Sequence, residues 1–425
     1  MKIAIAAYGA EGQASYRYYS KDPANDITIL DQDPDFVGPE GVPTIVGPDA
    51  FDNLQDFDLI LRSPPVSPDI LKTKGKIWSG TNEFFTKCPA DIIGVTGSKG
   101  KGTTSSLIAS ILEAAGRKVW LVGNIGVPVL DILDKVQPED VIVYELSSFQ
   151  LWDLQAAPST AVVLFIEQDH LDVHKDMADY VAAKGRITKF QTPDDILIYD
   201  SENEYSRSIA EDSKAQKVGY PGELTTHISE GFFYNGEQKL CSVDVLQIPG
   251  EHNKSNAIAA IDASWKYTQD PNVIEQGLHA FKGLPHRLAF VRTVDEVSYY
   301  DDSIATTPTS AVAALRSFDG PKVIILGGSS KGSDFMVIAE ELLRHDVHAL
   351  LIGDEAPSII IALEAVGFTD FEVMDTPTME KVVKRASELV RGGGVVLLSP
   401  AAASFGLFKN YADRGDQFIA AVNAL

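Results

Sequence analysis

Residues 92–116 read IIGVTGSKGKGTTSSLIASILEAAG, and this stretch decides the fold class. Its short apolar start predicts a buried strand, and its later apolar residues recur at helical spacing up to Gly116. Between them lies the glycine-rich turn Thr96–Thr103 (TGSKGKGT). Glycines let backbone N–H groups converge on phosphate oxygens, and a lysine adds positive charge. The stretch therefore predicts a nucleotide-binding α/β domain.

The loop residues that we expect to contact phosphate are Gly97, Ser98, Gly100, Lys101, Gly102 and Thr103. The loop departs from the common pattern, in which a hydroxyl residue directly follows the lysine. Gly102 stands at that position, and the first hydroxyl belongs to Thr103. Whether Thr103 makes the usual magnesium contact therefore stays open.

The segments after this loop continue to alternate between strand and helix, which predicts a parallel sheet. Glu145 follows the predicted strand 141–144, where its carboxylate could hold Mg²⁺ on a nucleotide. His170 lies just past the predicted strand 161–166 and could ligate a second cation. The alternatives are a solvated carboxylate and an ordinary surface histidine.

The same alternation extends in both directions along the chain. Residues 2–8 and 27–31 predict two strands, joined by a turn with Gly9 and Gly12 that resembles a Rossmann opening. The turn either binds a nucleotide-sugar phosphate or is only a tight connection. We therefore expect an α/β fold in three domains: a Rossmann-like domain (1–88), a central P-loop ATPase-type domain with a parallel sheet (89–284) and a C-terminal Rossmann-like domain (285–425).

Shorter elements complete this prediction. The middle domain is expected to include short strands between residues 195 and 250, with Asn235-Gly236 at a two-residue hairpin, and then a helix over 253–267. The strands predicted for the third domain are 297–300, 323–326, 350–352 and 395–398.

Composition limits the possible partners and compartments. The formal charge of -24 over 425 residues disfavours nonspecific binding to nucleic acid or anionic membranes. The only two cysteines are too few for a disulfide framework, which fits a reducing compartment. We find neither the layout of a signal peptide nor an apolar run long enough to cross a bilayer. The expectation is a cytoplasmic protein, taken as a monomer.

Ten motifs occur in the order and spacing of the Mur ligases, and the chain resembles that family. The stretch from the first to the last motif covers about three quarters of the chain. The motifs are TGSKGKGT (96–103), GNIG (123–126), ELSSFQL (145–151), DHLD (169–172), AAKGRI (182–187), GEHNKSN (250–256), GLPHR (283–287), DDSIAT (301–306), GGSSKGSDF (327–335) and SPAAASFGLFKNYADRG (399–415). The resemblance implies a ligase that uses ATP and two Mg²⁺ ions to join D-glutamate to UDP-N-acetylmuramoyl-L-alanine through an acyl phosphate.

The resemblance also implies roles for residues at matching motif positions. For ATP and magnesium these residues are Lys101, Thr103, Glu145, His170, Asn256, Arg287 and Asp302. For the UDP-sugar they are Gly9, Gly12, Asp31, Asn124 and Ser147, and for glutamate Thr306, Lys331, Ser404, Phe405 and Tyr411. Lys184 matches a lysine that is carbamylated in the family, where the new carboxylate helps to hold the second magnesium.

Three other interpretations stay open. Ile304 stands where the family's DSKAT motif has lysine, and some relatives that add L-glutamate could share such a change. The order GKG followed by a hydroxyl residue also occurs in folylpolyglutamate synthetase. A nucleotide-binding regulator or transport ATPase without ligase activity would need only the phosphate loop.

Overall fold

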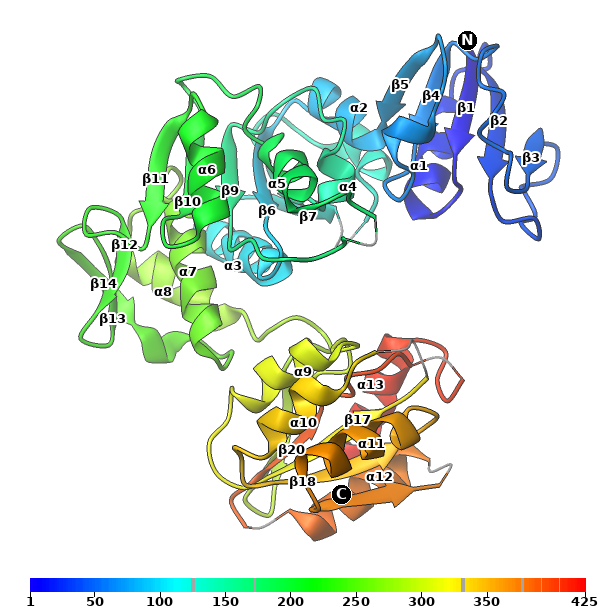
Figure 1. Cartoon of the computed structure of the whole chain (residues 1–425). Helices are drawn as coiled ribbons and strands as arrows, with labels where there is room; N and C mark the ends of the chain where they lie inside the picture. Colours follow the sequence, from blue (N-terminus) through cyan, green and yellow to red (C-terminus); the bar gives the residue numbers. More distant parts are fainter. Residues whose placement is uncertain (124–126, 172, 330–332, 376–377, 391, 405) are drawn as a thin grey trace. The chain divides into compact units, whose positions relative to one another are not determined.

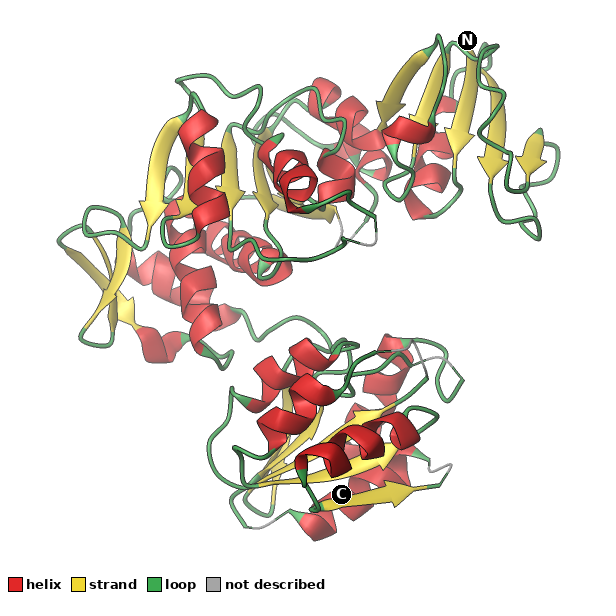
Figure 2. Cartoon of the chain, in the orientation of Figure 1, coloured by secondary structure: helices red, strands yellow, loops and turns green. Residues whose placement is uncertain are grey.

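The computed structural model describes residues 1–123, 127–171, 173–329, 333–375, 378–390, 392–404 and 406–425. It divides into two compact units, coloured along the chain in Figure 1. Unit 1 comprises Met1–Val245 and Lys254–Ala280, and unit 2 comprises Leu246–Asn253 and Phe281–Leu425. Each unit contains α-helices packed on mainly parallel sheets (Figure 2).

The strands are β1 Lys2–Ala6, β2 Asp26–Asp31, β3 Thr44–Val46, β4 Leu59–Arg62, β5 Lys76–Ser79, β6 Asp91–Thr96, β7 Val119–Gly123, β8 Val141–Glu145, β9 Thr160–Val163, β10 Ile196–Asp200, β11 Gln216–Tyr220, β12 Thr226–Ser229, β13 Phe232–Asn235, β14 Gln238–Ser242, β15 Ala289–Val294, β16 Val297–Asp301, β17 Lys322–Gly327, β18 Val347–Ile352, β19 Phe371–Met374 and β20 Val395–Leu398.

The α-helices are α1 Ala10–Tyr19, α2 Gly80–Lys87, α3 Lys101–Ala114, α4 Ser148–Leu151, α5 Met177–Gly185, α6 Glu204–Asp212, α7 Glu251–Ser264, α8 Pro271–Ala280, α9 Pro308–Leu315, α10 Met336–Leu342, α11 Ala356–Val366, α12 Met379–Leu389 and α13 Tyr411–Asn423. Short 3₁₀ helices lie at η1 Pro68–Ile70, η2 Val129–Asp131, η3 Leu133–Lys135 and η4 Val243–Val245.

The first sheet of unit 1 is parallel and has the order β3-β2-β1-β4-β5. Both of its faces are apolar, because alternate residues of β1 belong to two different hydrophobic clusters. Ala4 and Ala6 belong to the first cluster, and Ile3 and Ile5 belong to the second. The strand order reverses direction between β1 and β4. In open parallel sheets a ligand binds beside such a reversal, at the carboxyl ends of the strands.

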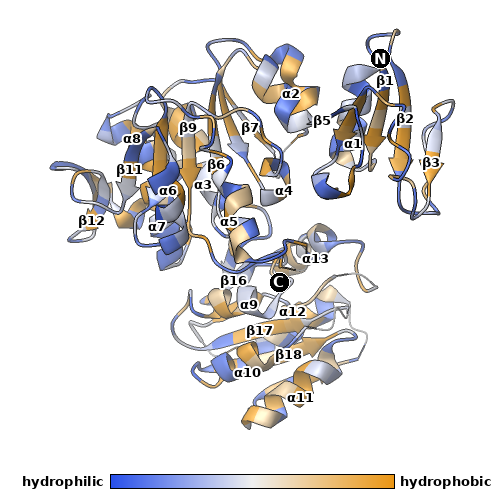
Figure 3. Ribbon diagram, turned by 45° about the horizontal axis from the view of Figure 1, so that its top comes forward, coloured by the Kyte–Doolittle hydropathy of each residue, from blue (hydrophilic) through white to orange (hydrophobic). Residues whose placement is uncertain are grey.

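The second sheet of unit 1 is also parallel, with the order β11-β10-β9-β6-β8-β7. Its central strands are buried, and β9 is hydrophobic along its length in Figure 3. A separate antiparallel sheet, β12-β13-β14, follows it in the chain. The glycine-rich loop leaves the carboxyl end of β6, which positions it at the ligand-binding edge.

Unit 2 has one sheet of order β15-β16-β20-β17-β18-β19. Helices α9, α10 and α11 share a core with one set of alternating residues of β17 and β18, and α12 and α13 share a core with the other set. The sheet is therefore covered by helices on both faces. All strand pairs in it are parallel except β15 with β16.

The expected α/β class with parallel sheets is confirmed, and several predicted bounds are wrong. The first strand ends at Ala6 rather than residue 8, because Ala7 has a left-handed φ of 66°. The strand predicted over 161–166 ends at Val163, and the helix predicted over 253–267 spans Glu251–Ser264. At the hairpin, Asn235 pairs with Gln238, so the two turn residues are Gly236 and Glu237. In the described part of the chain, no helix is long and apolar enough to cross a membrane.

Candidate functional site

The loop Gly97–Gly100 is held between β6 and α3 by its own polar contacts. The ammonium of Lys101 donates to the carbonyl oxygens of Gly97 and Ser98, each at 2.9 Å. The hydroxyl of Ser98 donates to the Glu167 carbonyl at 2.9 Å and lies 3.0 Å from the Tyr180 hydroxyl. The loop thus places a lysine charge at the amino end of a 14-residue helix, where backbone N–H groups favour an anion.

Gly102 and Thr103 lie buried in the first turn of α3, and Asn256 of α7 lies against the loop. Asn256 Oδ1 accepts a hydrogen bond from the Thr104 hydroxyl at 3.3 Å. Gly100 has a φ of 84°, and a Cβ there would lie 2.3 Å from Asn256 Oδ1. The close approach of Asn256 therefore requires glycine at position 100.

Lys184 of α5 is buried beneath the same loop. Its ammonium donates to Gly97 O at 2.8 Å and lies 4.5 Å from the centre of the Tyr180 ring. Burial lowers the pKa of Lys184 well below its usual value, and the positive charge of Lys101 lowers it further, whereas nearby carboxylates of Asp169 and Glu145 oppose the shift. Lys101, Lys184 and Glu145 therefore lie within electrostatic reach of one another.

Glu145 is the last residue of β8 and is buried, with its backbone paired beside Val95 of β6. This register brings the carboxyl end of β8 next to the start of the phosphate loop. Ser147, two residues on, is the N-cap of α4, and its hydroxyl accepts from the backbone N–H of Gln150 at 3.2 Å. The cap fixes the direction in which α4 leaves the sheet.

His170 is about half exposed and has a left-handed φ of 53°. Its ring centre lies 5.0 Å from that of Phe149. Its Nε2 lies 3.6 Å from the Asp169 carboxylate. The imidazole is thus at the carboxyl edge of the sheet, beside α4.

Sequence reasoning gave no role to His174, whose side chain is fully buried. Its Nδ1 lies 3.1 Å from Asp179 Oδ2, and its Nε2 lies 3.0 Å from the Ser148 hydroxyl. The ring stacks on Phe149 with an interplanar angle of 6°, and the His174 N–H donates to His170 O at 2.9 Å. His174 therefore anchors the turn that carries His170. Its spacing of four residues from His170 is the one sequence signal that could have suggested this.

At the first sheet, three of the expected UDP-sugar residues lie at the carboxyl ends of β1 and β2. Asp31 accepts from the backbone N–H of Tyr8 at 3.1 Å, and Gly9 is the N-cap of α1. A Cβ at Gly12 would lie 2.3 Å from Ala7 O, so the turn into α1 needs glycine there. Gly9, Gly12 and Asp31 are thus neighbours beside the reversal of strand order.

Asp302 of unit 2 is buried at the end of β16. Its carboxylate accepts from the Ser399 hydroxyl at 2.7 Å and from the Leu288 N–H at 3.1 Å. Burial raises the pKa of Asp302 to about 7, although both hydrogen bonds and the charge of the exposed Arg287 act in the other direction.

Arg414, to which sequence reasoning gave no role, is buried and connects the loops after β16 and β20. It donates to the hydroxyl and carbonyl of Ser303, at 2.9 and 2.8 Å, and to the carbonyls of Ala402 and Ala403, at 3.2 and 3.3 Å. Burial lowers the pKa of Arg414 to about 10, a value at which it stays charged near neutral pH. The carboxylate charge of Asp301 opposes this shift.

These contacts bring three of the expected glutamate residues to one edge of unit 2. Thr306 is half-buried in the loop after β16, Ser404 is buried beside Ala403, and the Tyr411 carbonyl accepts from the Ser303 hydroxyl at 2.7 Å. Three other expected site residues, Asn124, Lys331 and Phe405, lie outside the described residues.

Comparison with known proteins gives two family matches. The model of the Mur ligase middle domain matches residues 95–264, and that of the Mur ligase glutamate ligase domain matches residues 286–402.

Curated relatives match over most of the chain. A UDP-N-acetylmuramoylalanine–D-glutamate ligase of Clostridium tetani is 36% identical over 89% of this chain and 85% of its own length. The protein of the same name from Acetivibrio thermocellus is also 36% identical, with the same two coverages.

Solved structures share the fold at low identity. UDP-N-acetylmuramate-alanine ligase from Thermotoga maritima has a TM-score of 0.62 and 19% identity, covering 100% of this chain and 99% of its own. A folylpolyglutamate synthase from Mycobacterium tuberculosis has a TM-score of 0.59 and 17% identity, covering 80% and 92%.

Proposed function

The chain belongs to the Mur ligase family, and from this premise we propose that it joins D-glutamate to UDP-N-acetylmuramoyl-L-alanine with hydrolysis of ATP, in peptidoglycan synthesis. The observation that carries the proposal is the 36% identity, over nearly nine tenths of the chain, to ligases named for this reaction. The phosphate loop with Lys101 at the amino end of α3 supports the use of a nucleotide.

The chemistry follows from the low reactivity of a carboxylate toward an amine. Transfer of the γ-phosphoryl group of ATP to the carboxylate of the alanine gives an acyl phosphate, which the glutamate amine attacks to form the amide and release phosphate. Lys101 and the N–H groups of the loop would stabilise the charge on the transferred group. Water has to be excluded meanwhile, because an acyl phosphate hydrolyses readily.

Magnesium and a carbamate on Lys184 belong to this proposal. Mg²⁺ is commonly held by one or two carboxylates together with substrate phosphates and water. In the described ranges, no group of three or more His, Cys, Asp or Glu side chains is placed to hold a metal ion. Glu145 and His170 would hold the two Mg²⁺ ions, with Thr103 as a further ligand, and the bound ions would neutralise phosphate charge.

The lowered pKa of Lys184 supports carbamylation. A lowered pKa increases the fraction of the neutral amine, whose lone pair can add to CO₂. The N–C bond forms as a proton leaves, and the product is a carboxylate. Such a group at Lys184 would lie beside the phosphate loop and could act as a second carboxylate ligand.

We further propose a division of substrates among three domains, 1–88, 89–284 and 285–425. The first would bind the UDP-sugar at Gly9, Gly12 and Asp31, with Asn124 and Ser147 of the second near the acceptor carboxylate. The second would bind ATP through its loop and Asn256, while Arg287 and Asp302 approach the nucleotide from the third. The third would bind glutamate through Thr306, Lys331, Ser404, Phe405 and Tyr411. A monomer in the cytoplasm, where ATP and nucleotide sugars are available, completes the proposal.

The alternative amino acid is L-glutamate. Ile304 replaces the motif lysine, is half-buried, and donates its backbone N–H to His286 O at 3.0 Å. Position 304 thus makes a backbone hydrogen bond but lacks the positive charge of the motif lysine. The names of the relatives favour D-glutamate.

The deciding experiment is a coupled assay of phosphate release by the full chain. ATP, Mg²⁺ and UDP-N-acetylmuramoyl-L-alanine are supplied with either enantiomer of glutamate, and each component is omitted in turn. We expect release only with D-glutamate and the complete mixture. Turnover with L-glutamate alone would identify the L-specific variant, turnover with a folate acceptor a folylpolyglutamate synthetase, and release without any acceptor a nucleotide-binding ATPase.

A further inference from the structure

Two turns flank the reversal of strand order in the first sheet. One joins β1 to α1 and ends at Gly9, and the other is Ser63–Val66, directly after β4. They are linked to each other, because the Ser63 hydroxyl donates to Ala7 O at 2.7 Å. The place of the two turns is that of a ligand crevice in a parallel sheet.

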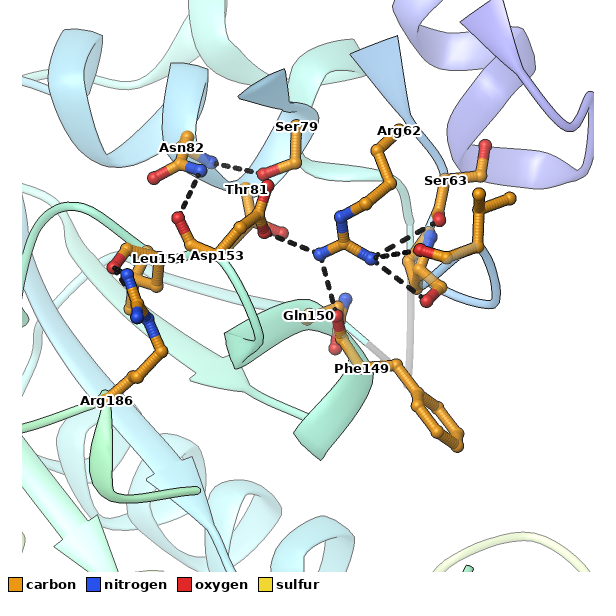
Figure 4. Close-up of polar contacts among 12 residues, drawn as sticks. Arg62, Ser63, Ser79, Thr81, Asn82, Phe149, Gln150, Asp153, Leu154 and Arg186 are labelled. Atoms are coloured by element: carbon orange, nitrogen blue, oxygen red, sulfur yellow. Dashed lines mark hydrogen bonds and ion pairs between the residues drawn. The ribbon is translucent and has the colours of Figure 1, made fainter. Parts of the chain in front are cut away.

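Arg62, the last residue of β4, lies beneath the second turn with its side chain fully buried. Figure 4 shows its guanidinium pointing toward both this turn and α4. Its Nη1 donates to Pro64 O at 3.1 Å and Val66 O at 3.0 Å. Its Nη2 donates to Phe149 O at 2.8 Å and pairs with Asp153 Oδ1 at 2.5 Å. One side chain thus joins the turn to the segment around α4.

The orientation of the guanidinium is set by the turn rather than by the carboxylate. An arginine that served only Asp153 would form two parallel bonds to its two oxygens. In the described part of the chain, Arg62 Nε and Asp153 Oδ2 are instead buried without a hydrogen-bonding partner. The prolines at 64 and 65 have no N–H group, so carbonyl oxygens are the main groups by which this turn can be held.

The first turn is joined to the same helix. Glu11, in the first helical turn of α1, accepts from Gln150 Nε2 of α4 at 2.7 Å. Burial raises the pKa of Glu11, and the hydrogen bond from Gln150 and the charge of Arg62 oppose that shift. Both turns beside the crevice are therefore tied to one short helix.

That helix begins three residues after Glu145, at the carboxyl edge of the second sheet. Phe149, whose carbonyl accepts from Arg62, places its ring against His170 and His174. A displacement of the Ser63–Val66 turn would be transmitted to α4 through a buried charge and its hydrogen bonds. The crevice beside the two turns and the edge of the second sheet that carries Glu145 are thus connected within unit 1.

We propose that Arg62 is a positioning residue for the UDP-sugar substrate: it holds the Ser63–Val66 turn against α4, so that the bound sugar nucleotide lies in register with the edge that carries Glu145. The inference rests on the proposed function, since it names the substrate of the crevice. In this proposal Arg62 contacts neither ATP nor glutamate. Its loss is expected to affect one substrate more than the others.

The test is the affinity of the full chain for UDP-N-acetylmuramoyl-L-alanine, measured by titration calorimetry, together with the KM of each substrate. The double variant Arg62→Met, Asp153→Asn removes both charges, because removing only one would leave the other buried and unpaired. We expect the Kd and KM for the UDP-sugar to rise about ten- to a hundredfold, as for the loss of charged hydrogen bonds. The KM for ATP should stay within about twofold.

A matched control is Arg17→Met. Arg17 of α1 forms two hydrogen bonds to Asp131 of η2, at 2.9 and 2.6 Å, and so bridges the same parts of unit 1 at an exposed position. Its loss should leave all three KM values unchanged, because exposed ion pairs contribute little. The conservative variant Arg62→Lys keeps a charge but has a single nitrogen, and it should recover part of the affinity.

Three results would overturn the inference: an unchanged Kd in the folded double variant, an equal loss of affinity for ATP and the UDP-sugar, or an equal effect of Arg17→Met. If the double variant does not fold, Arg62→Lys decides, and wild-type affinity in that variant counts against the proposal. Failure of the wild-type chain to bind the UDP-sugar would instead refute the proposed function, which separates the two outcomes.

Discussion

The amine of Lys184 is buried and donates a hydrogen bond to the Gly97 carbonyl, and burial favours its neutral form. The desolvation cost of a charged ammonium explains its lowered pKa, and the neighbouring charge of Lys101 adds to it. A lysine on a helix normally extends its charge into water. At this position the side chain is instead turned toward the loop, which supports the chemical role proposed for it.

We predict that Lys184→Ala loses nearly all ligase activity and that short-chain carboxylates restore part of it. The added anion would replace the carboxylate of the proposed carbamate. The assay is phosphate release with and without added carboxylate. Lys189→Ala, at an exposed lysine five residues away, is the control and should be as active as the wild type. Full activity of Lys184→Ala without supplement would contradict the assignment.

Asp302 provides a prediction about pH. Its pKa is about 7 in the folded chain against 3.8 for an ordinary aspartate, because it is buried. Between these values the folded state holds a proton that the unfolded state has released. Stability from this group is therefore greatest below pH 4 and declines by about 1.4 kcal/mol per pH unit up to pH 7. Above pH 7 no further loss is expected.

The measurement is hydrogen exchange of the adjacent strand β20 at several pH values, corrected for intrinsic rates. Asp302→Asn does not titrate. The opening free energy of the wild type should therefore fall relative to that of the variant as the pH rises from 5 to 7. The raised pKa of the buried neighbour Asp301, which is hydrogen-bonded to His286, is common to both proteins. A difference independent of pH would show that Asp302 is ionised throughout.

Residues that act through tertiary contacts were beyond sequence reasoning. Lys101 and Glu145 could be predicted because a loop or a strand end already implies their position. Arg62 and Gln150 find partners 91 and 139 residues away. Arg62 lies in none of the motifs, and Gln150 lies in ELSSFQL (145–151) but received no role from it. Their roles depend on how two sheets face each other, which the local pattern does not contain.

At the scale of elements, buried parallel strands were predictable and edge elements were not. A run such as β17, buried at every residue, stands out in the sequence. The short strands β3 and β19 and the antiparallel β15 lie at or next to sheet edges and are largely exposed or half-buried. Their sequences lack an apolar pattern that identifies a strand. They form strands because they pair with a neighbouring strand, and sequence analysis missed them.

The contact between α3 and α8 yields a prediction on stability. A Cβ at Gly277 would lie 2.5 Å from Ile111 Cα and 2.9 Å from Ile111 N, so the helices could not relax by turning a side chain. The Gly277 carbonyl also accepts from the Ser110 hydroxyl at 2.7 Å. We expect Gly277→Ala to lower the free energy of unfolding by about 1–3 kcal/mol, as for overpacked cores.

Urea unfolding followed by tryptophan fluorescence would measure this change, because the four tryptophans, 78, 120, 152 and 265, all lie in unit 1. The control is Gly185→Ala in α5, where the nearest atom to a new Cβ is a side-chain carbon of Ile209 at 3.5 Å, an ordinary contact. That variant should be as stable as the wild type or slightly more stable, because alanine favours a helix. Equal stability of both variants would refute the tight packing of α3 on α8.

For the whole molecule, the order of segments along the chain differs from their division between the two units. Residues 246–253 belong to unit 2, whereas residues 254–280, which follow them, belong to unit 1. Within α8, Ile274 and Leu278 are fully buried, and α7 buries Ile261 in the same unit. A segment that closes an apolar core cannot be removed without exposing that core to water. The proposed boundary near residue 284 agrees with this dependence but stays a prediction.

Fragments of the chain test that dependence directly. We predict that residues 1–280 fold with a cooperative urea transition, whereas residues 1–245 do not, because α3 loses the helices that cover it. Residues 281–425 should fold by themselves, since unit 2 has buried cores on both faces of its sheet. Circular dichroism and urea titration would measure both. A cooperative transition of residues 1–245 with wild-type stability would mean that α7 and α8 do not stabilise unit 1. The tight contact of Gly277 with Ile111 would then contribute nothing to the stability of that unit.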